Sequence, residues 1–289
     1  MDKRGTFFVL GAAVLWGTTG TAQALAPDGA SPLAIGALRL LVGGAALLGV
    51  FFLRRPAPGT PPAPRMPAGP ALLAAGCMAA YQVLFFAGVA KTGVAVGTIV
   101  GIGSSPVLAG LLGYLFRGER PGWRWGVATL LAVAGCTLLA LAGKEIDVDP
   151  LGMLLAVGAG GAYATFSLAS KGLLEQQPVE RVMAVVFSLG ALMLAPLLLT
   201  QNVNWLANPR GIGVVAWLGL AATALAYTLF GQGLRLTPVA TAVTLSLAEP
   251  LTAGALGVAL LGEQLTPASA AGIALIFGGL VVLSLPVRR

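Results

Sequence analysis

The stretch GERPGWRWGVATLLAVAGCTLLAL, residues 118–141, has a second version in the same chain, GEQLTPASAAGIALIFGGLVVLSL, residues 262–285. Both stretches begin with Gly-Glu and continue as a long apolar run that contains glycine. The offset that places Gly118 on Gly262 also places Pro106 on Pro250, Lys91 on Arg235 and Gly135 on Gly279. An internal repeat of this length has to be recognised first, because it determines how the rest of the chain is organised.

The repeat extends back to the N-terminal part of the chain. At slightly different offsets Gly5, Gly11, Trp16, Thr18 and Pro32 match Gly152, Gly158, Tyr163, Thr165 and Pro178. The chain of 289 residues is therefore one unit of about half its length, written twice. We predict units at residues 1–145 and 146–289 that together form one domain.

The composition indicates what kind of unit is repeated. Hydrophobic residues make up 57% of the chain and charged residues only 9%, with a mean hydropathy of +0.90. A soluble domain carries about 25% charged residues, so most of this surface does not face water. Glycine, present at 41 positions, is common in membrane helices because it lets them pack closely. The composition predicts a polytopic membrane protein.

Ten apolar segments are long enough to cross a bilayer as helices, which takes about 20 residues. They are residues 5–25, 33–53, 69–90, 95–116, 122–142, 151–172, 181–199, 211–233, 239–261 and 268–285. The short alternating stretches of a membrane β-barrel are not visible, so we predict an all-α membrane protein. The longest connection, residues 54–67, is too rich in proline to be helical.

The first segment also resembles a secretory signal. Lys3 and Arg4 precede an apolar run, and small residues of the kind found at cleavage sites occur at 22–26. The segment nevertheless matches residues 152–173, and its removal would leave the first unit one helix short. We expect a retained helix.

Basic residues indicate the orientation of the helices. An even number of spans puts both termini on one side, and with the termini inside most of the 17 Lys and Arg residues fall in inner segments. An excess of Lys and Arg in short loops marks the cytoplasmic side, so we predict that both termini are cytoplasmic. The pI near 10.0 then reflects orientation signals and not a face that binds nucleic acid.

Five spans in each unit is an odd number, so the second unit must start on the opposite side of the membrane. The linker 117–124 carries three Arg residues and its counterpart 261–267 carries none, which agrees with inversion. Inverted repeats are typical of secondary transporters, which bind their substrate near the midplane and alternate access to it.

The two Gly-Glu stretches, together with Leu15-Trp16-Gly17 in the first segment, resemble the EamA-type repeat of the drug/metabolite transporter superfamily. The resemblance covers essentially the whole chain. The resemblance implies ten helices and the movement of small metabolites, commonly by export. Within the family, the chain is most similar to bacterial inner-membrane exporters of aromatic and other amino acids. Arg120-Pro121 departs from the more usual apolar-Thr pattern of Leu265-Thr266, so the two linkers need not have the same role.

Glu249 lies near the middle of the ninth segment, directly before Pro250. An acidic residue at the bilayer centre costs ~2.5 kcal/mol or more and usually marks a substrate or ion pathway. The matching position of the first unit has Ser105 before Pro106, and both prolines predict helix kinks because each removes a backbone hydrogen bond. The alternative is a buried, protonated acid bonded to a neighbouring hydroxyl or amide.

Arg39 is the other charge inside a predicted span, about 10 Å below the outer end of its helix. A guanidinium matches a carboxylate in a bidentate fork, so Arg39 could hold the carboxyl group of an amino acid. The alternatives are an ion pair with Glu249 or extension of the side chain to the outer interface.

Transport sites are mostly apolar and aromatic, with a few convergent polar groups. The candidates for the substrate pathway are Trp16, Thr19, Arg39, Tyr81, Gln82, Phe85, Ser105, Tyr163, Tyr227, Thr244 and Glu249. Trp16 and Tyr163 are the strongest aromatic candidates because they occupy equivalent positions in the two units. For each residue taken alone, helix packing is the competing explanation.

The sequence offers little for other chemistry. With no His and two distant Cys no metal-binding spacing exists, and no Walker loop for ATP is present. We expect no cofactor, no nucleic acid and no enzymatic activity. The expected partners are a small-molecule substrate such as an amino acid, the lipid bilayer, and protons as a candidate coupling ion. The alternatives are transport of other metabolites or drugs, an integral-membrane enzyme acting on lipid-linked substrates, and a structural subunit.

Overall fold

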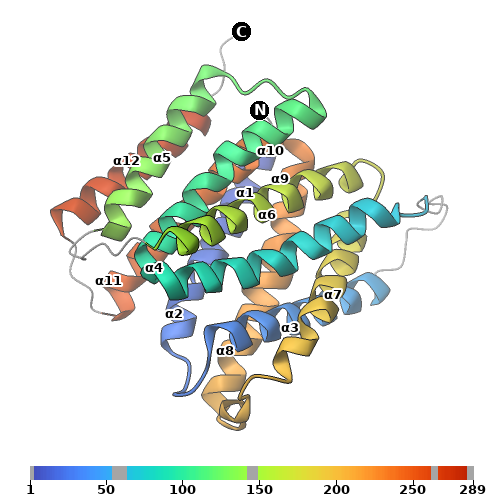
Figure 1. Ribbon diagram of the computed structural model, residues 1–289. Helices are drawn as coiled ribbons and strands as arrows, with labels where there is room; N and C mark the ends of the chain where they lie inside the picture. The colour runs from blue at the N-terminus through green and yellow to red at the C-terminus, as the bar shows by residue number, and fades with distance from the viewer. Residues whose placement is uncertain (1–2, 54–63, 142–148, 262–265, 285–289) are drawn as a thin grey trace.

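The computed structural model describes residues 3–53, 64–141, 149–261 and 266–284. Figure 1 shows a bundle of tilted helices, and no strand occurs among these residues. The all-α fold class is confirmed. The second Gly-Glu, residues 262–263, lies outside the described residues.

The described residues form a series of α-helices along the chain. Their bounds are α1 Lys3–Gly17, α2 Thr19–Ala24, α3 Pro32–Leu53, α4 Ala68–Arg117, α5 Trp123–Leu141, α6 Pro150–Leu174, α7 Val179–Leu198, α8 Pro209–Gly219, α9 Ala226–Leu236, α10 Val239–Leu245, α11 Glu249–Leu261 and α12 Pro267–Ser284. A π-helical segment, Leu220–Leu225, joins α8 to α9, and a 3₁₀ turn, Ser246–Ala248, joins α10 to α11.

The described helices are apolar enough for a membrane. Within the described ranges, nine helical segments have the length and hydropathy needed to cross a bilayer, and α5 adds a shorter apolar helix over Trp123–Leu138. Each of the ten predicted spans therefore corresponds to a helical region, which agrees with the expected polytopic architecture.

The predicted loop between the third and fourth spans is wrong, because α4 is helical throughout its 50 residues. The chain still turns within α4. A Cβ atom on Gly97 would lie 3.0 Å from the Cα atom of Val89, whereas eight residues of straight helix advance ~12 Å. A tight helical reversal thus replaces the expected loop, and α4 contains two spans.

Three other spans are interrupted within their predicted bounds, and only in the ninth did the sequence predict a kink, at Pro250. The first breaks between α1 and α2 at Thr18, whose hydroxyl donates to the Leu15 carbonyl oxygen at 2.7 Å. The eighth contains the π-helical segment, in which the Thr223 hydroxyl donates to the Leu218 carbonyl at 2.8 Å. The ninth contains the 3₁₀ turn directly before Glu249 and Pro250. The chain remains helical across Pro106.

The two units pack through corresponding contacts. In the α1–α9 pair, a Cβ on Gly5 would lie 2.8 Å from the methyl carbon of Thr237, and in the α4–α6 pair a Cβ on Gly152 would lie 2.5 Å from the methyl carbon of Thr92. Gly5 matches Gly152 in the repeat. Each threonine hydroxyl also donates to a glycine carbonyl one turn earlier in its own helix.

The α5–α12 pair is reciprocal in the same way, with the two helices side by side in Figure 1. A Cβ on Gly135 would lie 2.5 Å from the Gly272 carbonyl oxygen, and one on Gly279 would lie 2.8 Å from the Ala128 carbonyl oxygen. Because α1 and α4 of the first unit pack on α9 and α6 of the second, the two units interleave.

The start of α6 is fixed by Asp149, just outside the span. Asp149 Oδ1 accepts a hydrogen bond from the Gly152 backbone N–H at 3.0 Å, and Lys91 Nζ lies 3.5 Å from Asp149 Oδ2. The Gly152 bond, followed by the charge of Lys91, holds the pKa of the Asp149 carboxyl below its ordinary value. This is a helix N-cap strengthened by an ion pair.

Figure 1 places the start of α1 and the end of α12 at the same end of the bundle. That arrangement agrees with an even number of spans. Which side of the membrane this end faces stays a prediction from the charge distribution.

Candidate functional site

A cavity of about 330 Å³ lies in the middle of the bundle. Its walls come from both units: α1 and α2, α3, both arms of α4, α6, α9 and the α10–α11 junction. The lining residues are Trp16, Gly17, Thr19, Gly20, Gln23, Arg39, Tyr81, Gln82, Phe85, Phe86, Thr98, Ile102, Ser105, Tyr163, Tyr227, Val243, Ser246, Leu247, Glu249 and Ala253. A volume near 300 Å³ and an aromatic lining are typical of small-molecule sites.

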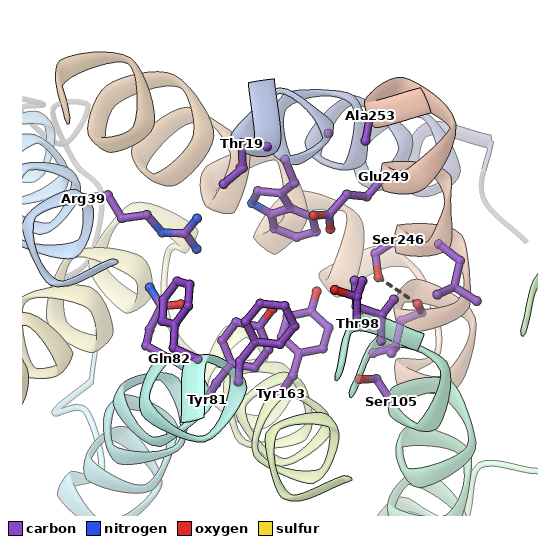
Figure 2. Close-up of a pocket in the computed structure, with 18 of the residues that line it drawn as sticks. Thr19, Arg39, Tyr81, Gln82, Thr98, Ser105, Tyr163, Ser246, Glu249 and Ala253 are labelled. Carbon is purple, nitrogen blue, oxygen red and sulfur yellow. Dashed lines mark hydrogen bonds between the residues drawn. The ribbon is translucent and has the colours of Figure 1, made fainter. Parts of the chain in front are cut away.

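All but one of the residues predicted from the sequence lie around this cavity. They are Trp16, Thr19, Arg39, Tyr81, Gln82, Phe85, Ser105, Tyr163, Tyr227 and Glu249. Figure 2 shows several of them converging on one space from different helices.

Thr244 is the exception, because it does not line this cavity. Its hydroxyl lies 3.2 Å from that of Thr129 on α5 and donates to the Ala240 carbonyl at 2.9 Å. Thr244 therefore joins α10 to α5. The prediction assumed one continuous helix from Thr244 to Glu249, but the 3₁₀ turn between them changes the helical phase.

The structure adds polar and aromatic lining residues that the sequence reasoning missed. Gln23, Phe86, Thr98 and Ser246 belong to this group. Their spacing was the available signal. Gln23 follows Thr19 by four residues and Ser246 precedes Glu249 by three, and residues so spaced share one face of a helix.

The two intramembrane charges approach the cavity from different walls. Arg39 projects from α3 and Glu249 from the first turn of α11, and Figure 2 shows both side chains pointing into the space between them. Arg39 is only 9% exposed, and its Nε finds no hydrogen-bond acceptor among the described residues. No carboxylate of the described chain lies within 4.0 Å of its guanidinium nitrogens. The direct Arg39–Glu249 ion pair, one of the alternatives from the sequence, is therefore not formed in this structure.

Arg39 is held in place by close packing of α3 on α4. One turn before Arg39, the Gly36 carbonyl accepts a hydrogen bond from Gln82 Nε2 at 3.3 Å. A Cβ on Gly36 would lie 2.8 Å from the Phe86 ring, so a larger residue at this position would require the ring to move. Gln82 thereby connects the cavity wall to the backbone that carries the guanidinium.

Glu249 lies where two interrupted helices meet. A Cβ on Gly17, the last residue of α1, would lie 2.7 Å from the Glu249 carbonyl oxygen. On the preceding turn the Ser246 hydroxyl donates to the Val243 carbonyl at 2.7 Å. The break in α1 and the break before α11 are thus adjacent, and broken helices at membrane depth are tolerated where they line a cavity.

Aromatic rings fill the wall between the two units. Trp16 and Tyr163, the equivalent pair, meet edge to face with ring centroids 6.3 Å apart. Trp16 also lies 4.8 Å from the Tyr227 ring, and Tyr81 stacks on Phe85 at 5.8 Å. Trp16 Nε1 and the Tyr163 hydroxyl have no hydrogen-bond partner among the described residues.

Ser105 contributes a hydroxyl at the opposite wall. It donates to the Gly101 carbonyl at 2.8 Å, four residues earlier in α4. The equivalent position carries the carboxylate of Glu249, so the two units present different chemistry to one space.

Within the described part of the chain, no group of three or more His, Cys, Asp or Glu side chains could hold a metal ion. Cys77 and Cys136 are separate free thiols. The arrangement is thus a cavity lined by one basic and one acidic side chain, Arg39 and Glu249.

The EamA-like transporter family matches the chain twice, over residues 3–141 and 150–285. The uncharacterized transporter YwfM of Bacillus subtilis (strain 168) is 48% identical over 285 residues, 98% of this chain and 95% of that protein. The threonine/homoserine exporter RhtA of Escherichia coli (strain K12) is 31% identical over 181 residues, 61% of this chain and 59% of RhtA.

A crystal structure of a protein 24% identical in sequence has the same fold, with a TM-score of 0.83 over 96% of this chain and 95% of that one. The two family matches fall on the two halves that the sequence repeat defined. The chain belongs to the EamA-like transporter family, and with it to the membrane transporters.

Proposed function

We propose that the protein is a secondary transporter that exports amino acids, including aromatic ones, across the bacterial inner membrane. The substrate would bind in the central cavity, and the two inverted units, 1–145 and 146–289, would alternate access to it. The exporter name of RhtA supports this substrate class.

One observation carries the proposal: the buried guanidinium of Arg39 faces a cavity that is otherwise mostly aromatic and apolar. A buried charge without a partner is costly, and a guanidinium is the side chain best suited to a carboxylate. Every free amino acid has a carboxylate, and the aromatic wall suits an apolar side chain. Protons are the proposed coupling ion, through the only other charged group of the cavity lining, Glu249.

The alternatives have less support. An enzyme acting on lipid-linked substrates would need clustered acids, His or Cys near the membrane face, whereas Glu119 of the first linker caps the start of α10. A structural subunit gives no reason for two charges in a central cavity. Transport of other metabolites or drugs would use the same cavity, and the substrate test distinguishes it.

The test is counterflow into proteoliposomes that contain the purified chain. Labelled threonine, methionine and phenylalanine should accumulate above the level of empty liposomes when unlabelled amino acid is trapped inside. Accumulation of none of these or related amino acids, with the protein folded, would reject amino-acid export.

A further inference from the structure

Arg39 and Glu249 line the same cavity but do not neutralise each other directly. Their charged atoms are more than 4.0 Å apart, and Figure 2 shows the two side chains reaching the cavity from different helices. Each charge on its own is unfavourable inside a membrane protein. The pair therefore suits a ligand that carries both charges on one small group.

We propose that the two side chains bind the two ends of a zwitterionic α-amino acid, with its carboxylate on Arg39 and its ammonium on Glu249. This rests on the proposed function and adds to it the orientation and charge state of the substrate. The site selects for both charged groups at once.

The chemistry of each wall supports this orientation. Arg39 is nine-tenths buried with its Nε unpaired among the described residues, and a guanidinium donates but cannot accept hydrogen bonds. Glu249, when ionised, can only accept hydrogen bonds, as an ammonium requires. Exchanging the two ends of the substrate would place like charges together.

A zwitterion pairs with both Arg39 and Glu249, whereas an organic acid pairs only with Arg39 and an amine only with Glu249. The second buried charge would then stay unpaired, which is strongly unfavourable. The cavity should therefore discriminate against substrates that lack either group, whatever their side chain.

The substrate side chain has an aromatic wall available. Figure 2 places Tyr81 and Tyr163 across the cavity from the two charges, and their ring centroids are 5.8 Å apart. A side chain that extends from the held α-carbon toward these rings contacts apolar surface, and stacked or edge contacts between aromatic rings are favourable.

The test compares three molecules that share one aromatic ring. Phenylalanine has both charged groups, 3-phenylpropionate lacks the ammonium, and phenethylamine lacks the carboxylate. Each competes with counterflow of labelled phenylalanine in proteoliposomes, and threonine with its deaminated and decarboxylated analogues forms a parallel set. In the unmodified protein both analogues should compete at least about tenfold more weakly than the amino acid, the size of one lost charge-assisted hydrogen bond.

Two variants then test which side chain binds the ammonium of the substrate and which binds its carboxylate. Glu249→Gln should weaken phenylalanine binding roughly tenfold or more, but it should not weaken 3-phenylpropionate binding, because that analogue has no ammonium to lose and the variant has no carboxylate left unpaired. By the same argument, Arg39→Gln should weaken phenylalanine binding but should not weaken phenethylamine binding. Asp28→Asn and Arg210→Gln remove the same charges at exposed positions outside the cavity and should alter neither pattern.

For each variant, the competition by different ligands is compared within the same protein preparation. Differences in folded yield between variants therefore do not affect the comparison. Equal competition by all three molecules in the unmodified protein would overturn the zwitterion site and leave export standing. Loss of 3-phenylpropionate binding in Glu249→Gln would also overturn it. Failure of every amino acid to show counterflow would reject the proposed function, and this inference with it.

Discussion

Glu249 begins α11 inside the ninth span, between a 3₁₀ turn and Pro250. A single carboxylate can hold either a proton or a substrate ammonium, so the two compete for it. We therefore expect transport to depend on a pH gradient, and Glu249→Gln to lose that dependence because an amide does not ionise. Uptake driven by imposed pH gradients measures this, with Asp28→Asn as the control. Unchanged gradient dependence in Glu249→Gln would reject the coupling role.

Arg39 offers a fork of donors that lysine cannot reproduce. Arg39→Lys keeps the positive charge, so we expect a folded protein with about tenfold weaker substrate affinity. The measurements are the KM of transport and the yield of monodisperse protein in detergent. Arg210→Lys, at an exposed position of α8, is the matched control. A large loss of yield with unchanged affinity would show instead that Arg39 has a structural role.

At the scale of elements, the α9–α10 connection is held by charged side chains from other parts of the chain. Lys171 of α6 donates to the carbonyl oxygens of Leu234, Arg235 and Thr237 at 2.7, 3.1 and 3.0 Å. On the other side of the junction, the Glu119 carboxylate accepts from the Val239 backbone N–H at 2.9 Å. A cation thus caps the end of α9 and an anion caps the start of α10, as the helix dipoles favour.

Lys171→Met should therefore destabilise the protein by roughly 1–3 kcal/mol, because three carbonyls lose a charged donor. The midpoint of thermal unfolding in detergent should fall accordingly. Lys91→Met, which breaks only the partly exposed pair with Asp149, should have a much smaller effect. Equal shifts for the two variants would contradict the capping role of Lys171.

The presence of the membrane-spanning helices could be predicted from the sequence, since the hydropathy and length of a segment indicate directly whether it can lie in a bilayer. The form of the interruptions could not. Nothing in the hydropathy of residues 211–233 distinguishes a π-helical segment. Lys91 and Thr92 mark the end of the third span, but nothing in the sequence indicates that the chain reverses there while staying helical. Those features depend on contacts between helices that are far apart in sequence.

The same reasoning explains the outcome for the site. Arg39 and Glu249 were identifiable because charge is rare in a span, and Trp16 and Tyr163 because the repeat aligns them. Thr244 does not line the cavity, because its expected position depended on an uninterrupted helix. Local chemistry was readable from the sequence, while helical phase across a break was not.

At the scale of the whole molecule, the repeat identifies positions that should exchange roles when access alternates. The offset that pairs Trp16 with Tyr163 also pairs Gln23 with Ser170. Gln23 lines the cavity, whereas Ser170 is 0% exposed and its hydroxyl has no hydrogen-bond partner among the described residues. The two equivalent positions are thus in different environments: Gln23 faces the cavity, whereas Ser170 is buried next to Lys171 in the sequence.

We expect these environments to interchange. In a protein with Cys77→Ser and Cys136→Ser, Gln23→Cys should react with a membrane-impermeant maleimide applied from outside in the absence of substrate, and Ser170→Cys should not react from either side. Substrate, or Lys171→Met, should make Ser170→Cys reactive from the cytoplasmic side, because the sealed end must then open. Labelling from a known side in inverted and right-side-out vesicles also tests the cytoplasmic placement of the termini. If Ser170→Cys stays unreactive while transport proceeds, the two positions do not exchange, and the units do not alternate about the axis that their sequence repeat implies.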